Sequence, residues 1–384
     1  MAKIGDICTI VSGSTPKSNV PEYWDGDIKW ITPAELNEGS YIIHDSVRHI
    51  TELGVEKTGL KPFPKGTVIL SSRAPIGKTA IAGCEMYCNQ GFKNLICSDK
   101  IDPRYLYWFL SAKTDYLNSL GRGATFKEIS KEIVANIEIP LPPIPEQIAI
   151  AERLEKTNNV ISLRKEQLAK LDELVKARFV EMFGDPMLNS KEWPMHQLSE
   201  YILFLTSGSR GWAQYFTEQG EYFITIKNVK NCRITLNDVQ HIVPPNNAEA
   251  ARTKVQEGDL LISITADLGR TGVVSKEIAE HGAYINQHLT CIRLDKSALN
   301  PLYVAYYMES EAGKTQFQAK NQNGVKAGLN FNAINSLRLF VPPLELQEKF
   351  TSFVEQMDRT KLTIQAGLDK LEVMKKALMQ EYFG

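Results

Sequence analysis

An internal repeat is the feature of this 384-residue sequence that most restricts its fold. Residues 142–147, Pro-Pro-Ile-Pro-Glu-Gln, recur 200 positions later as 342–347, Pro-Pro-Leu-Glu-Leu-Gln. The same offset continues without a gap as far as Phe183-Gly184 and its counterpart Phe383-Gly384. Self-similarity at a fixed offset indicates one structural unit that is present twice. The chain is therefore predicted to fold as two related halves.

Each copy of this segment is predicted to form one long helix. Prolines precede it, where a missing N–H has no consequence, and Gly184 stands where a C-terminal glycine is favoured. Apolar residues recur every seven positions, with Leu174 widening the first stripe. Two such helices favour an antiparallel pair or coiled coil over core helices of a globular domain. The expected helix-pair core is Leu154, Ile161, Leu168, Leu171, Val175, Met182, Val354, Met357, Ile364, Leu368, Leu371 and Leu378.

The segments that precede the two helices correspond more loosely. Residues 64–71 resemble 256–263, and Asn89-Gln90 pairs with Asn286-Gln287. Short β-rich runs (67–70, 260–264 and 289–294) alternate with short helices (103–113 and 301–310), which is typical of compact α/β domains. The predicted fold class is α/β, with two globular mixed α/β domains and two long antiparallel, coiled-coil-like helices in a pseudo-two-fold repeat. Domain 1 is 1–140, the central helix 141–186, domain 2 187–340 and the C-terminal helix 341–384.

Composition and charge restrict the class of protein. A hydrophobic content of 43% and a charged content of 23% are those of an ordinary soluble protein. No apolar run approaches the ~18 residues of a membrane span, and the first residues lack a signal-peptide pattern. The six cysteines have no framework spacing, which favours reduced thiols in the cytoplasm. Cys84 and Cys88 are not accompanied by two further ligands at metal spacing, so no zinc site is expected.

The charge balance does not favour a protein that grips DNA alone. The net charge is −1, and each of the four predicted segments carries a net charge between −1 and +1. A chain that binds DNA by itself usually has a basic surplus. If this chain binds DNA, its charges are sorted onto one face or a partner supplies much of the phosphate contact.

Enzymatic alternatives lack their motifs. Residues 72–79, Ser-Arg-Ala-Pro-Ile-Gly-Lys-Thr, approach a phosphate-binding P-loop, but the first glycine is missing and residues 79–83 are too short and turn-rich to open a helix. The equivalent stretch 267–271 has no lysine. No Asn-Pro-Pro-Tyr-type methyltransferase motif or glycine-rich cofactor loop is present. Accordingly, no catalytic, cofactor-binding or metal site is expected in this chain.

Several stretches together carry a resemblance to a known family. They are 139–147 and 174–186 with their second copies, 12–16 (Ser-Gly-Ser-Thr-Pro), and 24–33, which includes Trp-Asp-Gly-Asp-Ile and Trp-Ile-Thr-Pro. Over essentially its full length, the chain resembles the specificity (S) subunit of a type I restriction–modification system. The resemblance implies two target-recognition domains, each reading one half of a split, asymmetric double-stranded DNA site. It also implies a cytoplasmic role in DNA methylation and phage defence.

The same resemblance implies partners and a division of labour. Two methyltransferase (M) subunits, which bind S-adenosylmethionine and methylate adenine at N6, dock on the helices. Two motor-nuclease (R) subunits, which use ATP and Mg, join for cleavage. The chain itself binds no cofactor and catalyses nothing. Helices of about 37 residues would be ~55 Å long at 1.5 Å per residue, so helix length is expected to set the unread spacer between the half-sites.

Base reading in the major groove relies chiefly on Arg, Lys, Asn and Gln side chains. The candidates lie in polar loops that follow predicted strands and in glycine-flanked loops, which are suited to ordering on DNA. In domain 1 they are Ser14, Thr15, Lys17, Ser72, Arg73, Lys78, Asn89, Gln90, Lys93, Arg122, Thr125 and Lys127. In domain 2 they are Ser209, Arg210, Lys227, Asn228, Lys230, Thr265, Arg270, Asn286, Gln287, His288, Lys320, Asn321, Gln322, Asn323 and Lys326.

Two alternatives stay open at this point. Asn89-Gln90 and Asn286-Gln287 could be structural, because both copies keep them while the two domains are expected to read different bases. The chain could also be a coiled-coil scaffold that bridges partner subunits without reading DNA. Such a scaffold would tolerate featureless domains, whereas these domains carry polar, amide-rich loops.

Overall fold

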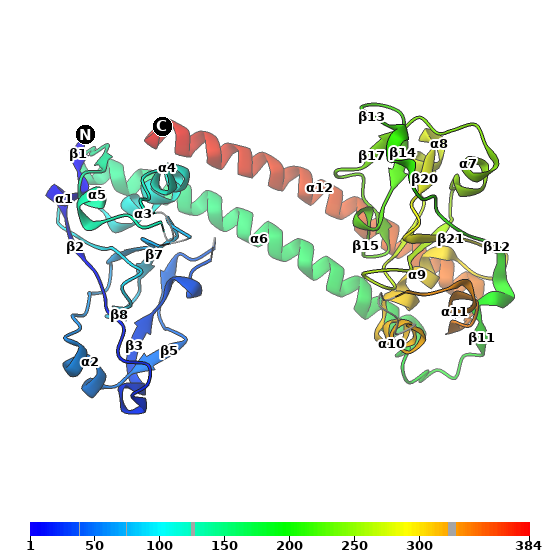
Figure 1. Cartoon of the computed structure of the whole chain (residues 1–384), viewed down its shortest axis with the longest axis horizontal. Coiled ribbons are helices and arrows are strands. Elements are labelled where there is room, and N and C mark those ends of the chain that lie inside the picture. The colour runs from blue at the N-terminus through cyan, green and yellow to red at the C-terminus, as the bar shows by residue number, and fades with distance from the viewer. Residues whose placement is uncertain (38, 74, 124–126, 322–327) are drawn as a thin grey trace. The chain divides into compact units, whose positions relative to one another are not determined.

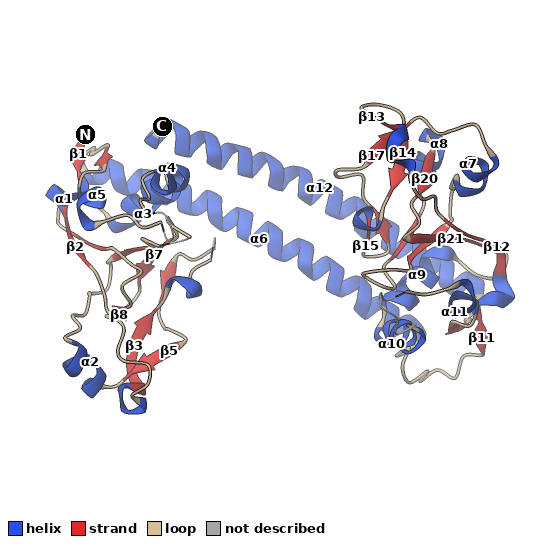
Figure 2. Ribbon diagram, in the orientation of Figure 1, coloured by secondary structure: helices blue, strands red, loops and turns tan. Residues whose placement is uncertain are grey.

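The computed structural model describes residues 1–384 except 38, 74, 124–126 and 322–327 (Figure 1). The chain divides into two compact units. Unit 1 comprises Met1–Glu166 with Gln365–Gly384, and unit 2 comprises Gln167–Ile364. Each unit holds a mixed α/β domain and a share of both long helices, which confirms the predicted fold class (Figure 2). The predicted boundaries of the four segments remain predictions.

Unit 1 is built around two small sheets in its described residues. One has five strands in the order β2 (Cys8–Val11), β9 (Asn94–Cys97), β6 (Val68–Leu70), β7 (Thr79–Ala82) and β4 (Ile42–Ile43). The other has the order β5 (Arg48–Ile50), β3 (Trp24–Ile31) and β8 (Tyr87–Cys88), and β1 (Ala2–Lys3) pairs separately with β10 (Glu138–Ile139). The helices are α1 (Ile4–Ile7), α2 (Glu52–Thr58), α3 (Pro103–Ala112), α4 (Thr114–Ser119) and α5 (Lys131–Ala135), with 3-10 turns η1 (Pro21–Tyr23) and η2 (Pro33–Glu35).

Unit 2 contains two four-stranded sheets in the residues that the structure describes. The first has the order β12 (Ile202–Ser207), β21 (Leu289–Leu294), β18 (Leu260–Ser263) and β19 (Thr271–Val273). The second has the order β13 (Phe216–Thr217), β17 (Gln240–Ile242), β14 (Glu221–Ile224) and β20 (Ala283–Ile285). Two further pairs are β15 (Val229–Lys230) with β16 (Arg233–Ile234) and β11 (Met195–Gln197) with β22 (Arg338–Phe340).

The remaining elements of unit 2 are short helices and turns. The helices are α7 (Ala248–Thr253), α8 (Lys276–His281), α9 (Pro301–Glu309), α10 (Glu311–Lys320) and α11 (Phe331–Asn335). The 3-10 turns are η3 (Leu198–Tyr201), η4 (Trp212–Tyr215) and η5 (Ile226–Asn228).

The two units share a common frame. The strand order β2-β9-β6-β7 of unit 1 matches β12-β21-β18-β19 of unit 2, and every neighbouring pair in both is antiparallel. A helix that starts at a proline follows in each, with Asp102 capping α3 and Asn300 capping α9 through their side chains. Both caps satisfy the free N–H groups of the first turn. The repeat read from the sequence is therefore a repeat of structure.

The two long helices are α6 (Ile144–Phe183) and α12 (Leu344–Phe383). Within unit 1, Lys165 Nζ pairs with Glu372 Oε1 at 2.8 Å, and Lys375 Nζ donates to Asn158 Oδ1 at 2.7 Å. Residue numbers therefore rise on one helix as they fall on the other, so the helices run antiparallel there. Within unit 2, the ion pair of Asp172 with Lys361 and the contact of Arg178 with the Phe353 ring give the same direction. Neither helix is apolar enough to cross a membrane, nor is any other helix in the described part of the chain.

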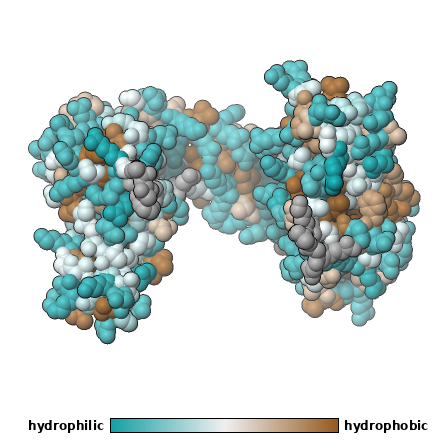
Figure 3. Space-filling view, in the orientation of Figure 1, coloured by the Kyte–Doolittle hydropathy of each residue, from teal (hydrophilic) through white to brown (hydrophobic). Residues whose placement is uncertain are grey.

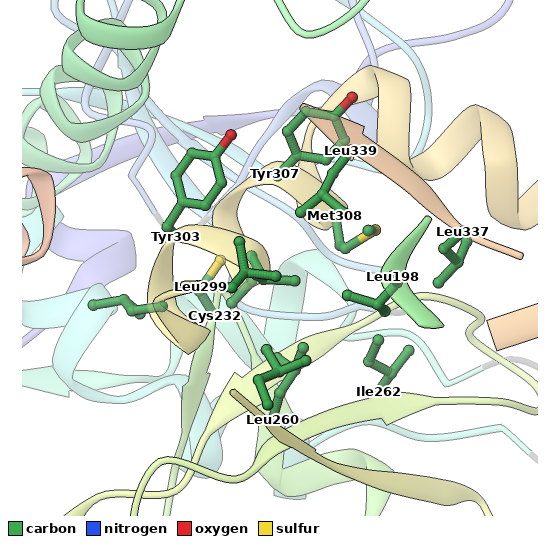
Figure 4. Close-up of a cluster of buried hydrophobic side chains, with 14 of the residues drawn as sticks. Leu198, Cys232, Leu260, Ile262, Leu299, Tyr303, Tyr307, Met308, Leu337 and Leu339 are labelled. Atoms are coloured by element: carbon green, nitrogen blue, oxygen red, sulfur yellow. The ribbon is translucent and has the colours of Figure 1, made fainter. Parts of the chain in front are cut away.

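Each domain packs against the last turn of a long helix. In unit 1, Tyr105 of α3 meets Phe383 of α12 with ring centroids 5.3 Å apart. In unit 2, Tyr303 of α9 meets Phe183 of α6 at 4.8 Å. Phe183 and Phe383 are 200 positions apart and both are buried, so the repeat closes both cores with the same aromatic contact. Figure 4 shows Tyr303 within the buried cluster of unit 2.

The helix-pair residues named from the heptads are all buried or partly buried. Leu154 is fully buried and Val175 is 1% exposed, whereas Leu168, Leu171, Met357, Leu371 and Leu378 are partly buried. The inclusion of Leu174 in the first stripe was wrong, because its side chain is 48% exposed. It precedes Val175 by one residue, which turns it ~100° away around the helix axis.

Candidate nucleic-acid interface

One group of candidates lies in a turn that both units build in the same way. The turn joins β6 to β7 in unit 1 and β18 to β19 in unit 2. The Ser71 hydroxyl accepts from the N–H of Lys78 at 2.9 Å, and the Ser263 hydroxyl accepts from the N–H of Arg270 at 2.8 Å. This turn connects two antiparallel strands, whereas a P-loop connects a strand to a helix whose N-terminus holds phosphate. The sequence likeness to a P-loop therefore has no structural counterpart.

A second turn, just ahead of β9 and β21, also repeats. Asn89 Oδ1 accepts from the N–H of Gly91 at 2.9 Å, and Asn286 Oδ1 accepts from the N–H of His288 at 3.2 Å. Asparagine side chains that bond to the backbone two residues on stabilise turns. The structural alternative for Asn89 and Asn286 thus has a geometric basis in both units.

The serines that follow β2 and β12 lie against this second turn. The N–H of Ser14 donates to the Cys88 carbonyl at 3.0 Å, and that of Ser209 donates to the Ile285 carbonyl at 2.9 Å. A Cβ atom on Gly208 would lie 2.2 Å from the Ile285 carbonyl oxygen. The glycine before each serine is thus needed for the close approach of two backbones. Ser209 itself is buried, and its hydroxyl is engaged within the domain.

In unit 1 these turns carry a charged cluster of Arg73, Lys93 and Glu128. Arg73 Nε donates to Glu128 Oε2 at 2.9 Å, and Lys93 Nζ donates to Glu128 Oε1 at 3.0 Å. The Lys93 side chain is 9% exposed, whereas that of Arg73 is 45% exposed. Burial raises the pKa of Glu128, but the hydrogen bonds from Lys93 and Arg73 outweigh it and hold that pKa below its ordinary value. The Glu128 carboxylate is therefore ionised at neutral pH, and the formal charges of the three side chains sum to +1.

In unit 2 the equivalent place holds a polar cluster of Thr265, Gln287 and His288, and Arg270 of the same turn pairs with Asp267. Thr265 Oγ1 lies 2.6 Å from His288 Nδ1, and Gln287 Nε2 lies 3.2 Å from His288 Nε2. In unit 1, Thr15 and Gln90 form a comparable polar contact, with Oγ1 and Oε1 2.5 Å apart. The two units thus bring several of the predicted candidates together at the same two turns, but with different side chains.

Several other candidates are held by the domain itself. Lys78 Nζ donates to the Leu36 carbonyl at 2.5 Å, and Lys320 Nζ donates to Ser336 Oγ at 2.8 Å. Asn228 is buried and bonds on both sides of its amide. Those that project into solvent are Lys17, Arg122, Lys127, Arg210, Lys227 and Lys230. Four further candidates lie outside the described residues: Thr125, Gln322, Asn323 and Lys326. The Asn321 side chain accepts a hydrogen bond from the N–H of Gly328 at 3.0 Å.

Glu128 is not among the sequence candidates, because a carboxylate only accepts hydrogen bonds whereas the candidates are mainly donors and amides. A signal for it exists, since the gapless 200-residue offset extends upstream of 140. Ser130 and Asn330, 200 positions apart, both cap the following helix with their side chains. The same offset sets Glu128 opposite Gly328. Backbone bridges confirm this alignment, because Arg73 pairs with Glu128 as Thr265 pairs with Gly328.

Both halves of the chain match one known protein family. The model of the type I restriction modification DNA specificity domain matches residues 1–173 and again 202–373. The chain belongs to this family. Its two specificity domains match the two halves of the repeat, which confirms the resemblance stated from the sequence.

Two individual relatives of this chain are type I restriction enzyme specificity subunits. The type I restriction enzyme MjaIX specificity subunit of Methanocaldococcus jannaschii is 37% identical over 247 residues, or 59% of this chain and 57% of that protein. The match thus spans just over half the length of that relative. The EcoKI specificity subunit of Escherichia coli K12 is 24% identical over 383 residues, or 93% of this chain and 81% of that protein.

Two solved structures share the fold of this chain. One comes from work on complex assembly and conformational transition of the type I restriction–modification system, with a TM-score of 0.61 and 19% identity. It covers 100% of this chain and 96% of the other. The type I S subunit from M. genitalium gives a TM-score of 0.59 at 15% identity, covering 100% and 95%.

Proposed function

We propose that this chain is the DNA sequence-specificity subunit of a type I restriction–modification enzyme, and that each unit reads one half of a bipartite, asymmetric site. The observation that carries the proposal is a shared frame with different polar side chains. Unit 1 places Arg73, Lys93 and Glu128 at these turns, where unit 2 places Thr265 and His288. Two readers on one frame with different donors and acceptors suit two dissimilar half-sites.

The proposed protein partners are two methyltransferase subunits docked on the long helices, joined by two motor-nuclease subunits for cleavage. Support comes from apolar side chains that the chain leaves open on these helices. Leu163 is 63% exposed, Leu362 71% and Val373 67%. Figure 3 shows such apolar side chains among hydrophilic ones along the helices. We assign these side chains to the proposed docking surface, and a repeated frame suits two copies of one partner.

In this proposal the chain carries no catalytic residue and binds no cofactor. S-adenosylmethionine, ATP and Mg belong to the partner subunits. The six free thiols of the chain suit work in the reducing cytoplasm. Among the described residues, no three His, Cys, Asp or Glu side chains are grouped so as to hold a metal ion.

The test is to co-express the chain with the methyltransferase encoded beside it, in a host that lacks adenine methylation, and to map every N6-methyladenine. A single split, asymmetric motif with one methylated adenine in each half is the expected result. A stable complex with an active methyltransferase that leaves the genome unmethylated would contradict the proposal. That outcome would favour the alternative of a coiled-coil scaffold that bridges partner subunits without reading DNA. The family match does not support this alternative.

A further inference from the structure

We propose that Arg73 reads a guanine in the half-site of unit 1, and that Glu128, held by Lys93, is its positioning residue. The inference rests on the proposed function and assigns one base contact within it. Its basis is a chain of contacts that runs from the buried Lys93 outward to the exposed Arg73.

Lys93 is the buried end of this series of contacts. Its side chain is 9% exposed, and its Nζ donates to Glu128 Oε1 at 3.0 Å and to Ser72 Oγ at 3.3 Å. A buried ammonium group with two such partners holds the carboxylate in one place. Both oxygens of Glu128 are then engaged, because Oε2 accepts from Arg73 Nε at 2.9 Å.

The contact with Glu128 orients the Arg73 guanidinium but engages only one of its three nitrogen atoms among the described residues. Its Nε is bound to Glu128, and no hydrogen bond to another described residue occupies Nη1 or Nη2. Guanine presents two acceptors, O6 and N7, in the major groove, and a guanidinium edge matches them with two parallel donors. A guanidinium that is fixed in advance loses less conformational freedom on binding. The net positive charge of the cluster also suits a surface that meets DNA.

The cluster is a feature of unit 1 and not of the shared frame. The turns, their serine and asparagine caps and the strand register all recur in unit 2. The charged residues do not, because Arg73 corresponds to Thr265 and Glu128 to Gly328. By the register of β9 and β21, Lys93 corresponds to Thr290. The hydrogen bonds of the turns occur in both units, whereas the contacts that link Lys93, Glu128 and Arg73 occur in unit 1 alone among the described residues. This difference is expected of residues that distinguish one half-site from the other.

The test compares methylation motifs of the assembled complex carrying Arg73→Ala, Arg73→Lys or Glu128→Gln, with Lys61→Ala, an exposed lysine elsewhere in unit 1, as control. Wild type should require guanine at one position of one half-site. Arg73→Ala should lower the preference for that guanine roughly 5- to 100-fold, as expected for loss of a bidentate contact. The other half-site and the Lys61→Ala motif should not change.

The two milder variants separate reading from folding. Arg73→Lys keeps the charge but removes the paired donors, so preference for guanine should fall while overall DNA affinity is largely kept. Glu128→Gln should keep the half-site but weaken the preference for its guanine, and its loss of stability at neutral pH should leave the complex folded. An unchanged motif in Arg73→Ala or in Arg73→Lys would overturn the inference. If the wild-type complex itself yields no split motif, the proposed function fails first and the inference fails with it.

Discussion

Gln147 and Gln347 are buried amides that tie the start of each long helix to its domain. Gln347 Oε1 accepts from the N–H of Asn300 at 2.8 Å, while its Nε2 donates to the carbonyls of Ala298 (3.2 Å) and Pro342 (2.8 Å). Gln147 makes the same three bonds to the equivalent backbone groups of unit 1. Both side chains are fully buried, so every polar atom of the amide is satisfied without water.

Gln347→Ala should therefore lower the free energy of unfolding by about 2–4 kcal/mol, because it leaves buried backbone groups without partners. Urea unfolding measures the change. Glu348→Ala, at the exposed neighbouring position, is the matched control and should change stability by less than about 0.5 kcal/mol. Equal stability of the two variants would show that the amide is replaceable by water.

Glu128 gives the cluster of unit 1 a defined pH dependence. Its pKa lies below the ordinary 4.5, because hydrogen bonds from Lys93 and Arg73 outweigh the effect of burial. A carboxyl whose pKa is lowered by folding stabilises the folded state above its unfolded pKa, and this contribution disappears as pH falls through the folded pKa. The stability difference between wild type and Glu128→Gln should thus be constant near neutral pH and shrink below about pH 4.5. Urea unfolding at a series of pH values would detect it, and a difference that grows on acidification would contradict it.

At the scale of elements, replacing a glycine should have opposite effects on stability in a helix and in a turn. Gly367 lies within α12, and a Cβ atom there would meet nothing within 4 Å. Gly367→Ala should stabilise the chain by about 0.5–1 kcal/mol, because alanine loses less backbone entropy in a helix. Gly208→Ala is the contrasting variant and should destabilise it, since its Cβ would lie 2.2 Å from a carbonyl oxygen. Thermal unfolding of both variants should give shifts of opposite sign, and a lower melting temperature for Gly367→Ala would refute the first prediction.

Elements were predictable where the pattern was local or repeated. Both long helices, the strand 289–294 and the helices after Pro103 and Pro301 follow from periodicity and capping. The charged cluster was not fully predictable, because Glu128 is 55 positions from Arg73 and only the fold brings them together. Lys78 is a DNA-contact candidate by residue type, and in the structure its ammonium group donates to the carbonyls of Pro33 and Leu36 in its own domain. Residue type and loop position thus locate the turns but do not say which side chains remain free.

On the scale of the whole molecule, the repeat exchanges helix ends between the two copies. The domain that precedes α6 packs against Phe383 of α12, and the domain that precedes α12 packs against Phe183 of α6. Each unit therefore needs residues from both helices to complete its core. Neither copy could bury its aromatic cluster alone, which explains why the offset is kept without a gap along the helices and less strictly within the domains.

Helix length then has a predicted consequence for the DNA site. Four residues inserted after Glu166 in α6 and four after Ile364 in α12 leave the contacts within each unit in register. Each helix becomes ~6 Å longer, which is close to two base pairs at 3.4 Å each. The methylated motif should keep both half-sites and gain about two base pairs of unread spacer. An insertion in α6 alone is the control and should impair folding, because the helices lose their pairing. A matched pair of insertions that returns the original spacer would show that helix length does not set the distance between the two readings.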